Sequence, residues 1–425
     1  MIDEDRVAAA VPTNVRDVCA RLTAAGYQAV TVGGAVRDAL LGREPGDWDV
    51  ATSARPEAVL ALFAHTIPTG LQHGTVTIVT GRGEASHVEV TTFRGEGAYT
   101  DARRPDHVVF GVPLVEDLAR RDLRVNAMAF DPGTREFHDP FHGRIDIAEK
   151  RLRAVGPTGN VYDDAVARFS EDGLRVMRAV RFAAVLEFAL DADTERGIVP
   201  ALPSLAKVSR ERVSDELRKI LATREPSRAL RIAHRTGILE IIAPDIARVI
   251  AVEPWLARVD LASRDARLGA FAADLAGAPS RRADRASGAR TEQILRGLKF
   301  SNEECALAAA LVSVASAARL DTWTEPHVRR LLADLTRARI AVALSLWRAS
   351  GASTLPDLAG QIAARGDALA LGDLAVAGKD LMDLGMAPGR ALGQTLTQLL
   401  ERVLDDPTLN TKPQLLALAT AQQLS

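Results

Sequence analysis

Two aspartates with one residue between them, Asp47 and Asp49, form the motif of this sequence that is most able to do chemistry. In an extended segment both carboxylates would face one pocket, while Trp48 between them faces the other way. Two close carboxylates are costly unless a cation neutralises them, and Mg²⁺ prefers carboxylate and phosphate oxygens. Two metal ions could there activate a hydroxyl nucleophile and stabilise a leaving pyrophosphate. A solvated turn is the alternative, because this spacing is common.

A pair of glycines, Gly33 and Gly34, lies upstream at a predicted turn between a strand and a helix. Their missing side chains would let the backbone approach a triphosphate, whose oxygens the exposed N–H groups can bind. Arg37, one turn into the predicted helix, could reach the same phosphates. The sequence contains no complete G-x-x-x-x-G-K-S/T or G-x-G-x-x-G run, which argues against ATPases and dinucleotide-binding proteins. An ordinary tight turn would explain the glycines, but not their closeness to the two aspartates.

The elements that must position these residues follow from the pattern of the first 155 residues, which is that of a mixed α/β domain. A helix capped by Thr13 should run to Gly26, and a strand should follow it over residues 27–32. Further strands are predicted over residues 48–51, 75–79, 87–93 and 125–131. Asp47 and Asp49 then lie where one of these strands begins.

Beyond Pro157 the strand pattern nearly disappears, and helical spacing of apolar residues continues to the end of the 425-residue chain. Breaks between helices are expected at residues 223–226, 279–290 and 366–378. We therefore predict an α+β fold, in which an N-terminal head with a mixed β-sheet precedes an elongated all-α neck, body and tail. The predicted domains are residues 1–155, 156–225, 226–335 and 336–425.

Composition and charge argue against several classes of protein. The longest nearly apolar run, Ala306–Ala318, is too short to cross a bilayer, and the acidic N-terminus does not resemble a secretion signal, so a cytoplasmic protein is expected. Cys19 and Cys305 are too few and too far apart to indicate disulfides or a zinc site. The net charge is −2, yet Ala165–Arg235 contains more Arg and Lys than Asp and Glu, so this segment is expected to meet phosphates.

Several motifs follow one another in order over roughly half of the chain, and together they resemble the class II tRNA nucleotidyltransferase and poly(A) polymerase family. The motifs are Gly33–Gly42 with Asp47–Asp49, Thr91–Arg94 with Tyr99, Asp101 and Arg103–Pro105, Arg120–Ala129, Asp139–Gly143, Glu171–Phe182 and Ser209–Leu221. Three positions depart from the usual pattern, since Gly173 replaces proline, Leu123 replaces phenylalanine and His142 replaces glycine. None of these departures removes a reacting group.

The resemblance implies roles for particular residues. Asp47 and Asp49 are the implied catalytic residues and metal ligands, with Mg²⁺ as the cofactor. Glu89 could add a third acid, although a surface glutamate on a strand is about as plausible. The implied nucleotide-binding residues are Gly33, Gly34 and Arg37 for the triphosphate, Arg121 and Asp122 for the ribose, and Asp172, Arg175, Arg178 and Arg181 for the base.

Asp172 and Arg175 are three residues apart, so in a helix they would share one face, with Arg178 and Arg181 extending the row. Cytosine and adenine each present an amino donor beside a ring-nitrogen acceptor, which a carboxylate and a guanidinium can match. Uracil and guanine place a carbonyl where that amino group should be. The resemblance thus implies selection of CTP and ATP without a template, whereas the alternative is an ion pair on a solvated helix.

Within the family, Pro68–Thr77 resembles the tRNA-specific branch, and the implied function is addition of CCA to the 3′ end of tRNA from CTP and ATP. An intact flexible loop over Arg94–Gly111 favours the full CCA over CC alone, and Gly378–Leu381 with Asn410–Thr411 resembles a tail that grips tRNA. CC-adding, A-adding and poly(A)-adding enzymes are the alternatives, and an inactive RNA-binding helical protein is one of another class. Ala273-Asp274 replaces the His-Asp pair of a second, phosphohydrolase activity, which is therefore not expected.

Overall fold

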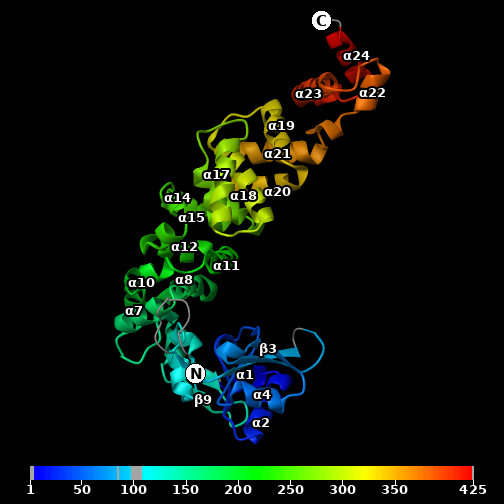
Figure 1. The fold of residues 1–425 in the computed structure, drawn as a ribbon. Coiled ribbons are helices and arrows are strands. Elements are labelled where there is room, and N and C mark those ends of the chain that lie inside the picture. Colours follow the sequence, from blue (N-terminus) through cyan, green and yellow to red (C-terminus); the bar gives the residue numbers. More distant parts are fainter. Residues whose placement is uncertain (1–3, 84–85, 97–107, 424–425) are drawn as a thin grey trace. The chain divides into compact units, whose positions relative to one another are not determined.

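The computed structural model describes residues 4–83, 86–96 and 108–423 (Figure 1). The chain forms two compact units, Met1–Ile242 and Ala243–Ser425. The first unit contains a β-sheet and helices, and the second is built from helices, so the predicted α+β fold is confirmed. Within the described ranges, no helix is both long enough and apolar enough to cross a membrane.

A seven-stranded mixed sheet forms the core of the first unit, with the strand order β3-β4-β5-β2-β1-β8-β9. Its central strand is β2 (Asp49–Thr52), which pairs antiparallel with β1 (Ala29–Val32) on one side and parallel with β5 (His87–Thr92) on the other. The other strands of this sheet are β3 (Thr66–Gly70), β4 (Thr75–Val79), β8 (Ala129–Phe130) and β9 (Phe137–His138). Two small pairs complete the strands, β6 (Arg94–Glu96) with β7 (Val108–Phe110) and β10 (Arg151–Leu152) with β11 (Ala189–Leu190).

The strands predicted around residues 27–32, 48–51, 75–79 and 87–93 are confirmed within a residue or two at their ends. The strand predicted over 125–131 is mostly wrong, because Arg124–Asn126 forms a 3₁₀ turn and only Ala129–Phe130 pairs in the sheet. Val125 and Met128 are fully buried. The apolar run that suggested a strand therefore indicates that these residues are buried, not that the backbone is extended.

Helices cover both faces of this sheet. The apolar residues Val15, Val18 and Leu22 lie on the buried side of α2 (Thr13–Ala24), which packs against β1 and β2. Pro12, not Thr13, is the N-cap residue of this helix, and Thr13 is its first residue, so the predicted cap was wrong by one position. On the other face, α5 (Leu114–Ala119) packs its leucines against Val30 and Val32 of β1. The remaining helices in this part are α1 (Glu4–Ala10), α3 (Gly34–Leu40), α4 (Pro56–Leu62) and α6 (Gly143–Glu149).

The rest of the first unit is helical. Its longer helices are α7 (Val161–Glu171), α8 (Leu174–Leu186), α10 (Ile198–Leu205), α11 (Arg210–Leu221) and α12 (Pro226–Arg235), and its short ones are α9 (Ala192–Arg196) and α13 (Ile238–Ile242). The buried faces of α11 and α12 both pack on α8, which is therefore the central helix of this group. The predicted break at residues 223–226 is confirmed between α11 and α12.

Asp172 and Arg175 do not share the face of one helix, so that prediction was wrong. The chain leaves helical geometry at Asp172 (φ −134°, ψ 103°), which ends α7, and Gly173 then starts α8. At Gly173 the chain passes so close to α10 that a Cβ atom would lie 2.2 Å from the backbone nitrogen of Leu205. This close packing, which a sequence pattern does not reveal, accompanies the break in the helix.

The second unit consists of helices throughout its described residues. They are α14 (Pro244–Ala247), α15 (Val252–Leu261), α16 (Arg267–Ala272), α17 (Arg285–Gly297), α18 (Asn302–Ala315), α19 (Glu325–Ala333), α20 (Arg337–Ala349), α21 (Thr354–Arg365), α22 (Gly378–Asp383), α23 (Arg390–Asp405) and α24 (Lys412–Gln423). The predicted break at 366–378 is confirmed, whereas the break at 279–290 ends earlier, because Asp284 caps α17. Buried leucines of α22, α23 and α24 form a separate apolar cluster near the end of the chain.

Candidate active site

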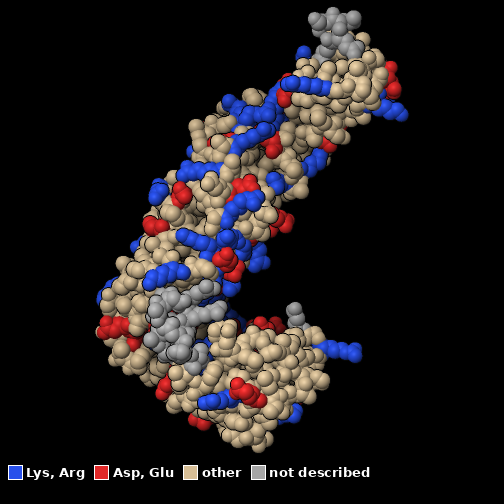
Figure 2. All heavy atoms as spheres, in the orientation of Figure 1, with Lys and Arg blue, Asp and Glu red and all other residues tan. Residues whose placement is uncertain are grey.

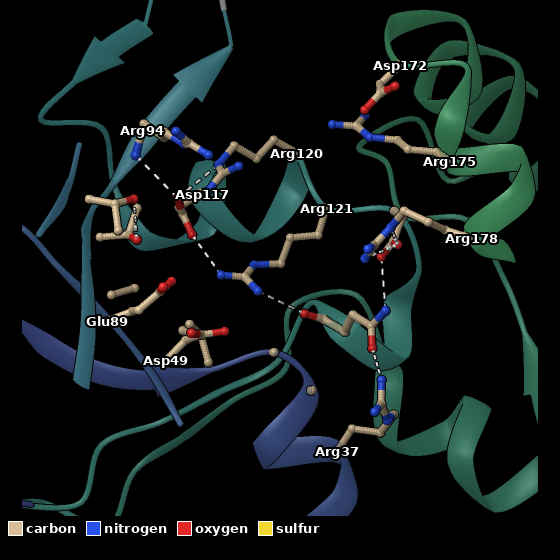
Figure 3. Close-up of a pocket in the computed structure, with 18 of the residues that line it drawn as sticks. Arg37, Asp49, Glu89, Arg94, Asp117, Arg120, Arg121, Asp172, Arg175 and Arg178 are labelled. Atoms are coloured by element: carbon tan, nitrogen blue, oxygen red, sulfur yellow. Dashed lines mark hydrogen bonds and ion pairs between the residues drawn. The ribbon is translucent and has the colours of Figure 1, made fainter. Parts of the chain in front are cut away.

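A cavity of about 700 Å³ in the first unit brings together residues from the sheet and from the helices that follow it (Figure 3). All of the nucleotide-binding residues predicted from the sequence line it: Gly33, Gly34, Arg37, Arg121, Asp122, Asp172, Arg175, Arg178 and Arg181. Asp49 and Glu89 line it as well. The sequence therefore located one site, although its members are up to about 150 residues apart along the chain.

Asp49 and Glu89 are direct partners in the parallel register of β2 and β5, which places both carboxylates on the same face of the sheet. Asp47 precedes β2 and is exposed, and unlike Asp49 it is not among the residues that line the cavity. Trp48, between the two aspartates, is buried. The pKa of Asp49 is raised to about 6 by burial in the cavity and by the negative charges of Glu89 and Asp47, with Arg121 acting in the opposite direction. Glu89 is thus part of the acidic end and not an isolated surface residue.

This acidic end fits a divalent cation, because a bound positive charge would offset both the desolvation of Asp49 in the cavity and the repulsion from its neighbours. In the described part of the chain, no three side chains of His, Cys, Asp or Glu are gathered closely enough to form a full metal-binding cluster. Mg²⁺ normally binds through one or two carboxylates, with water and substrate phosphates completing its coordination. Asp49, with Asp47 nearby, therefore offers carboxylate oxygens of the kind that Mg²⁺ accepts.

Gly33 makes the tight turn between β1 and α3 with a positive φ of 79°, which glycine adopts at little cost. A Cβ atom at this position would lie 2.7 Å from Nη1 of Arg121, so the glycine also makes room for that arginine. Arg37 is largely buried, and its guanidinium donates to Asp38 and Asn126 and lies over the ring of Phe182. Arg37 thus links α3 to the wall of the cavity.

Asp117, at the back of the cavity, was missed from the sequence. This residue is 1 % exposed, and it pairs with Arg120 at 2.9 Å and with Arg121 at 3.4 Å. It also accepts a hydrogen bond from the backbone N–H of Arg94, where β6 begins. Burial acts to raise the pKa of Asp117, but Arg120 and Arg121 hold it below its ordinary value. The spacing of these residues by three and four was the signal that could have revealed the cluster.

Asp122 is buried, and both of its oxygens are engaged. Oδ1 accepts from the backbone N–H of Leu123 and from Nδ2 of Asn126, while Oδ2 accepts from Nε of Arg178 at 2.7 Å. Although burial opposes ionisation, Arg178 and Asn126 keep the pKa of Asp122 well below its usual range. In this arrangement Asp122 holds Arg178 at the cavity wall.

The helical end of the cavity carries Asp172 and Arg175 (Figure 3). Asp172 is paired with Arg212 of α11, and Arg175 is paired with Glu171 at the end of α7. Arg181 is paired with Glu216, whose side chain is almost fully buried. Arg212 and Glu216 were not predicted as members of the site, because pairing over 35 to 40 residues leaves no local pattern. Glu171 was also missed, although its spacing of four residues from Arg175 is a local signal that could have revealed the pair.

The strands β6 and β7 lie at the two ends of the loop that the sequence predicted over Arg94–Gly111. Tyr99, Asp101 and Arg103–Pro105, on which the resemblance partly rested, lie outside the described residues. Arg94 lines the cavity, and its guanidinium donates to the carbonyl oxygen of His73. The first strand of the loop therefore starts at the cavity wall.

Comparison with known families agrees with this geometry. Residues 29–153 match the poly A polymerase head domain, residues 187–250 match the RNA and SrmB-binding site of polymerase A, and residues 285–419 match domain 2 of the tRNA nucleotidyltransferases. The chain is 36 % identical over 401 residues to the CCA-adding enzyme of Lactococcus lactis, covering 92 % of this chain and 93 % of that one. It is 38 % identical over 406 residues to the CCA-adding enzyme of Geobacillus stearothermophilus, with 92 % of each chain covered.

Among solved structures, the chain resembles the Bacillus stearothermophilus CCA-adding enzyme in complex with CTP, with 32 % identity, a TM-score of 0.70, and coverage of 97 % of this chain and 98 % of that one. The Thermotoga maritima CCA-adding enzyme shares the fold at 17 % identity, with a TM-score of 0.69 and coverage of 99 % and 98 %. These matches extend over the carboxylate end, the helical end and the whole second unit. With these matches, and with the acids and arginines of its motifs gathered in one cavity, the chain belongs to the class II family of CCA-adding enzymes and poly(A) polymerases.

Proposed function

We propose that this protein adds CCA to the 3′ end of tRNA from CTP and ATP, releasing pyrophosphate and using no nucleic-acid template. The observation that carries the proposal is the single cavity, with carboxylates at one end and an aspartate and an arginine able to read a base at the other. A nucleotide lying across it would place its phosphates at the acids and its base at Asp172 and Arg175. CCA-adding relatives over nine-tenths of the chain support the same function.

The family implies a divalent metal, and we propose Mg²⁺ held by Asp47 and Asp49. When bound, it would favour attack by the 3′-hydroxyl and stabilise the leaving pyrophosphate. Gly33 and Gly34 let the backbone approach the triphosphate, and Arg121, held by Asp117, faces the same space. Asp122 positions Arg178, and the two together form the wall against which the ribose is expected to lie.

We also propose the four-part division of the chain, with catalysis in residues 1–155, base recognition in 156–225 and tRNA binding mainly in 226–335 and 336–425. Lys and Arg are prominent on the helical elements in Figure 2, and Arg248 and Arg285 of the second unit are strongly exposed. Exposed arginines of this kind bind phosphates in a manner that does not depend on sequence. A tRNA substrate implies that the protein works in the cytoplasm.

The test is incubation of the purified protein with Mg²⁺, a tRNA that lacks its terminal CCA, and each labelled nucleotide in turn. Addition of two C residues and then one A is expected, with a stop after the A. Repeated addition of A to unrelated RNA would instead indicate a poly(A) polymerase, and a stop at CC or a need for tRNA-CC would indicate a partial enzyme. Binding of tRNA with no incorporation would indicate an inactive RNA-binding protein.

A further inference from the structure

We propose that Arg212 controls the choice of nucleotide by fixing the carboxylate of Asp172 and leaving it one open acceptor position. The inference rests on the proposed function, since it concerns how the same site distinguishes CTP and ATP from UTP and GTP. Arg212 belongs to the motif Ser209–Leu221. The proposed function, as described so far, assigns no role to this motif in metal binding or in phosphate binding. Arg212 is a positioning residue, because it acts through Asp172.

The contact between the two side chains is bidentate. Nη1 of Arg212 donates to Oδ1 of Asp172 at 3.2 Å, and Nη2 donates to Oδ2 at 2.7 Å. Two parallel hydrogen bonds from a planar guanidinium fix the plane of the carboxylate as well as its position. A third donor, the backbone N–H of Leu174 at the start of α8, bonds to Oδ1 at 3.0 Å. Asp172 is thus held from α11 and from α8 at once.

These bonds decide what Asp172 can still accept. An ionised carboxylate has about four acceptor positions, two on each oxygen. Among the described residues, two donors occupy Oδ1 of Asp172 and one occupies Oδ2, which leaves a single position on Oδ2. The exocyclic amino group of cytosine or adenine can donate to it. The carbonyl of uracil or guanine would meet the same oxygen with a lone pair and be repelled.

Arg175, the expected partner of the ring nitrogen, is held in a similar way. Its Nη1 donates to Glu171 at 2.6 Å and to the carbonyl oxygen of Arg168 at 3.1 Å. The donor, Arg175, is therefore held by Glu171, and the acceptor, Asp172, is held by Arg212. If Arg212 were lost, Asp172 could turn away, and Arg175 alone could donate to the carbonyl oxygens of uracil and guanine.

The experiment compares Arg212→Ala and Arg212→Lys with a matched control, Arg218→Ala. Arg218 lies on the same helix and its side chain is equally exposed, at 33 %, but it pairs with Asp215 and does not line the cavity. For each variant, kcat/KM is measured with CTP, UTP, ATP and GTP on tRNA lacking CCA. Arg212→Ala should lower the CTP/UTP and ATP/GTP ratios about tenfold, the scale of one good base contact. Arg212→Lys, which cannot form the bidentate pair, should lower them less, and Arg218→Ala should leave them unchanged.

A second arm links the effect to Asp172. In the double variant Asp172→Asn with Arg212→Ala, the ratios should match those of Asp172→Asn alone, because both changes remove the same interaction. If Arg212→Ala loses kcat/KM equally for all four nucleotides, the inference is overturned. If the alanine variant does not fold, Arg212→Lys decides: unchanged CTP/UTP and ATP/GTP ratios in the folded lysine variant would also overturn the inference. A wild-type protein with no preference for CTP and ATP would instead overturn the proposed function.

Discussion

The two ends of the cavity treat charge in opposite ways. At the sheet end, Asp49 and Glu89 lie side by side with Asp47 nearby, and burial together with these like charges raises the pKa of Asp49 to about 6. At the helical end, Asp172, Arg175, Arg178 and Arg181 are each paired with an oppositely charged side chain. The first end carries an excess of negative charge, whereas the charged side chains of the second are held in ion pairs. One cavity thus combines a region of unbalanced charge with a region of paired charges.

The largest expected effect comes from the sheet end. Asp49→Asn should lower nucleotide incorporation by about a thousandfold or more, because several kcal/mol of metal-assisted stabilisation are lost. Folding should not suffer, since the change removes a charge that lies among other acids. Nucleotide incorporation with Mg²⁺ and the melting temperature measure these two properties. Normal incorporation, or a large fall in the melting temperature, would contradict the contrast drawn between the two ends.

Removal of a charge at the helical end should have the opposite effect on stability. Asp122→Asn leaves Arg178 without its charged partner, and the cost should be about 3 kcal/mol in the free energy of unfolding. The pKa of Asp122 in the folded protein lies below its unfolded value of about 3.9, so the pair contributes stability above that pH and loses it as the pH falls further. Denaturant unfolding at several pH values should therefore show the gap between wild type and variant closing below about pH 4. A gap that stays constant down to pH 2 would show that the charge of Asp122 is not responsible.

Asp172→Asn and Arg175→Ala test the reading of the base. Each should change the ratio of kcat/KM between CTP and UTP, and between ATP and GTP, by about 1–3 kcal/mol. The loss should fall on selectivity rather than on the metal requirement, because both side chains lie at the end of the cavity away from the acids. Titration of activity with Mg²⁺ is the control. Unchanged ratios in both variants would mean that the base is read elsewhere.

Glu89→Gln should have the smallest effect of the four. The glutamine keeps the size of the side chain and removes one of the charges beside Asp49, so incorporation should fall about tenfold, or roughly 1.4 kcal/mol, if Glu89 supports the metal-binding aspartates. The melting temperature should stay the same or rise. Incorporation at the wild-type rate over a full Mg²⁺ titration would leave Asp47 and Asp49 as the only acids needed.

The sequence predicted the sheet end well, because its elements carry local signals. Gly33 and Gly34 marked the turn into α3, and the alternation around Asp49 marked β2. The helical end was predicted in its residues but not in its geometry. The break at Asp172 accompanies contact with α10, and the pairing of Asp172 with Arg212 joins residues 40 positions apart. The helix break and the ion pair both depend on residues that are distant in sequence. The local periodicity therefore predicted a continuous helix through Asp172 and Arg175.

The close passage of Gly173 against α10 has a consequence for how this chain can evolve. The family motif that this segment resembles has proline there, and the φ of −56° at Gly173 would suit a proline ring. The obstacle is the Cβ atom, which would lie 2.2 Å from the backbone nitrogen of Leu205. A return to proline would require α10 to move at the same time, so position 173 and residues 204–205 should show strong epistasis. A single substitution of Gly173 by proline would therefore be selected against in this background.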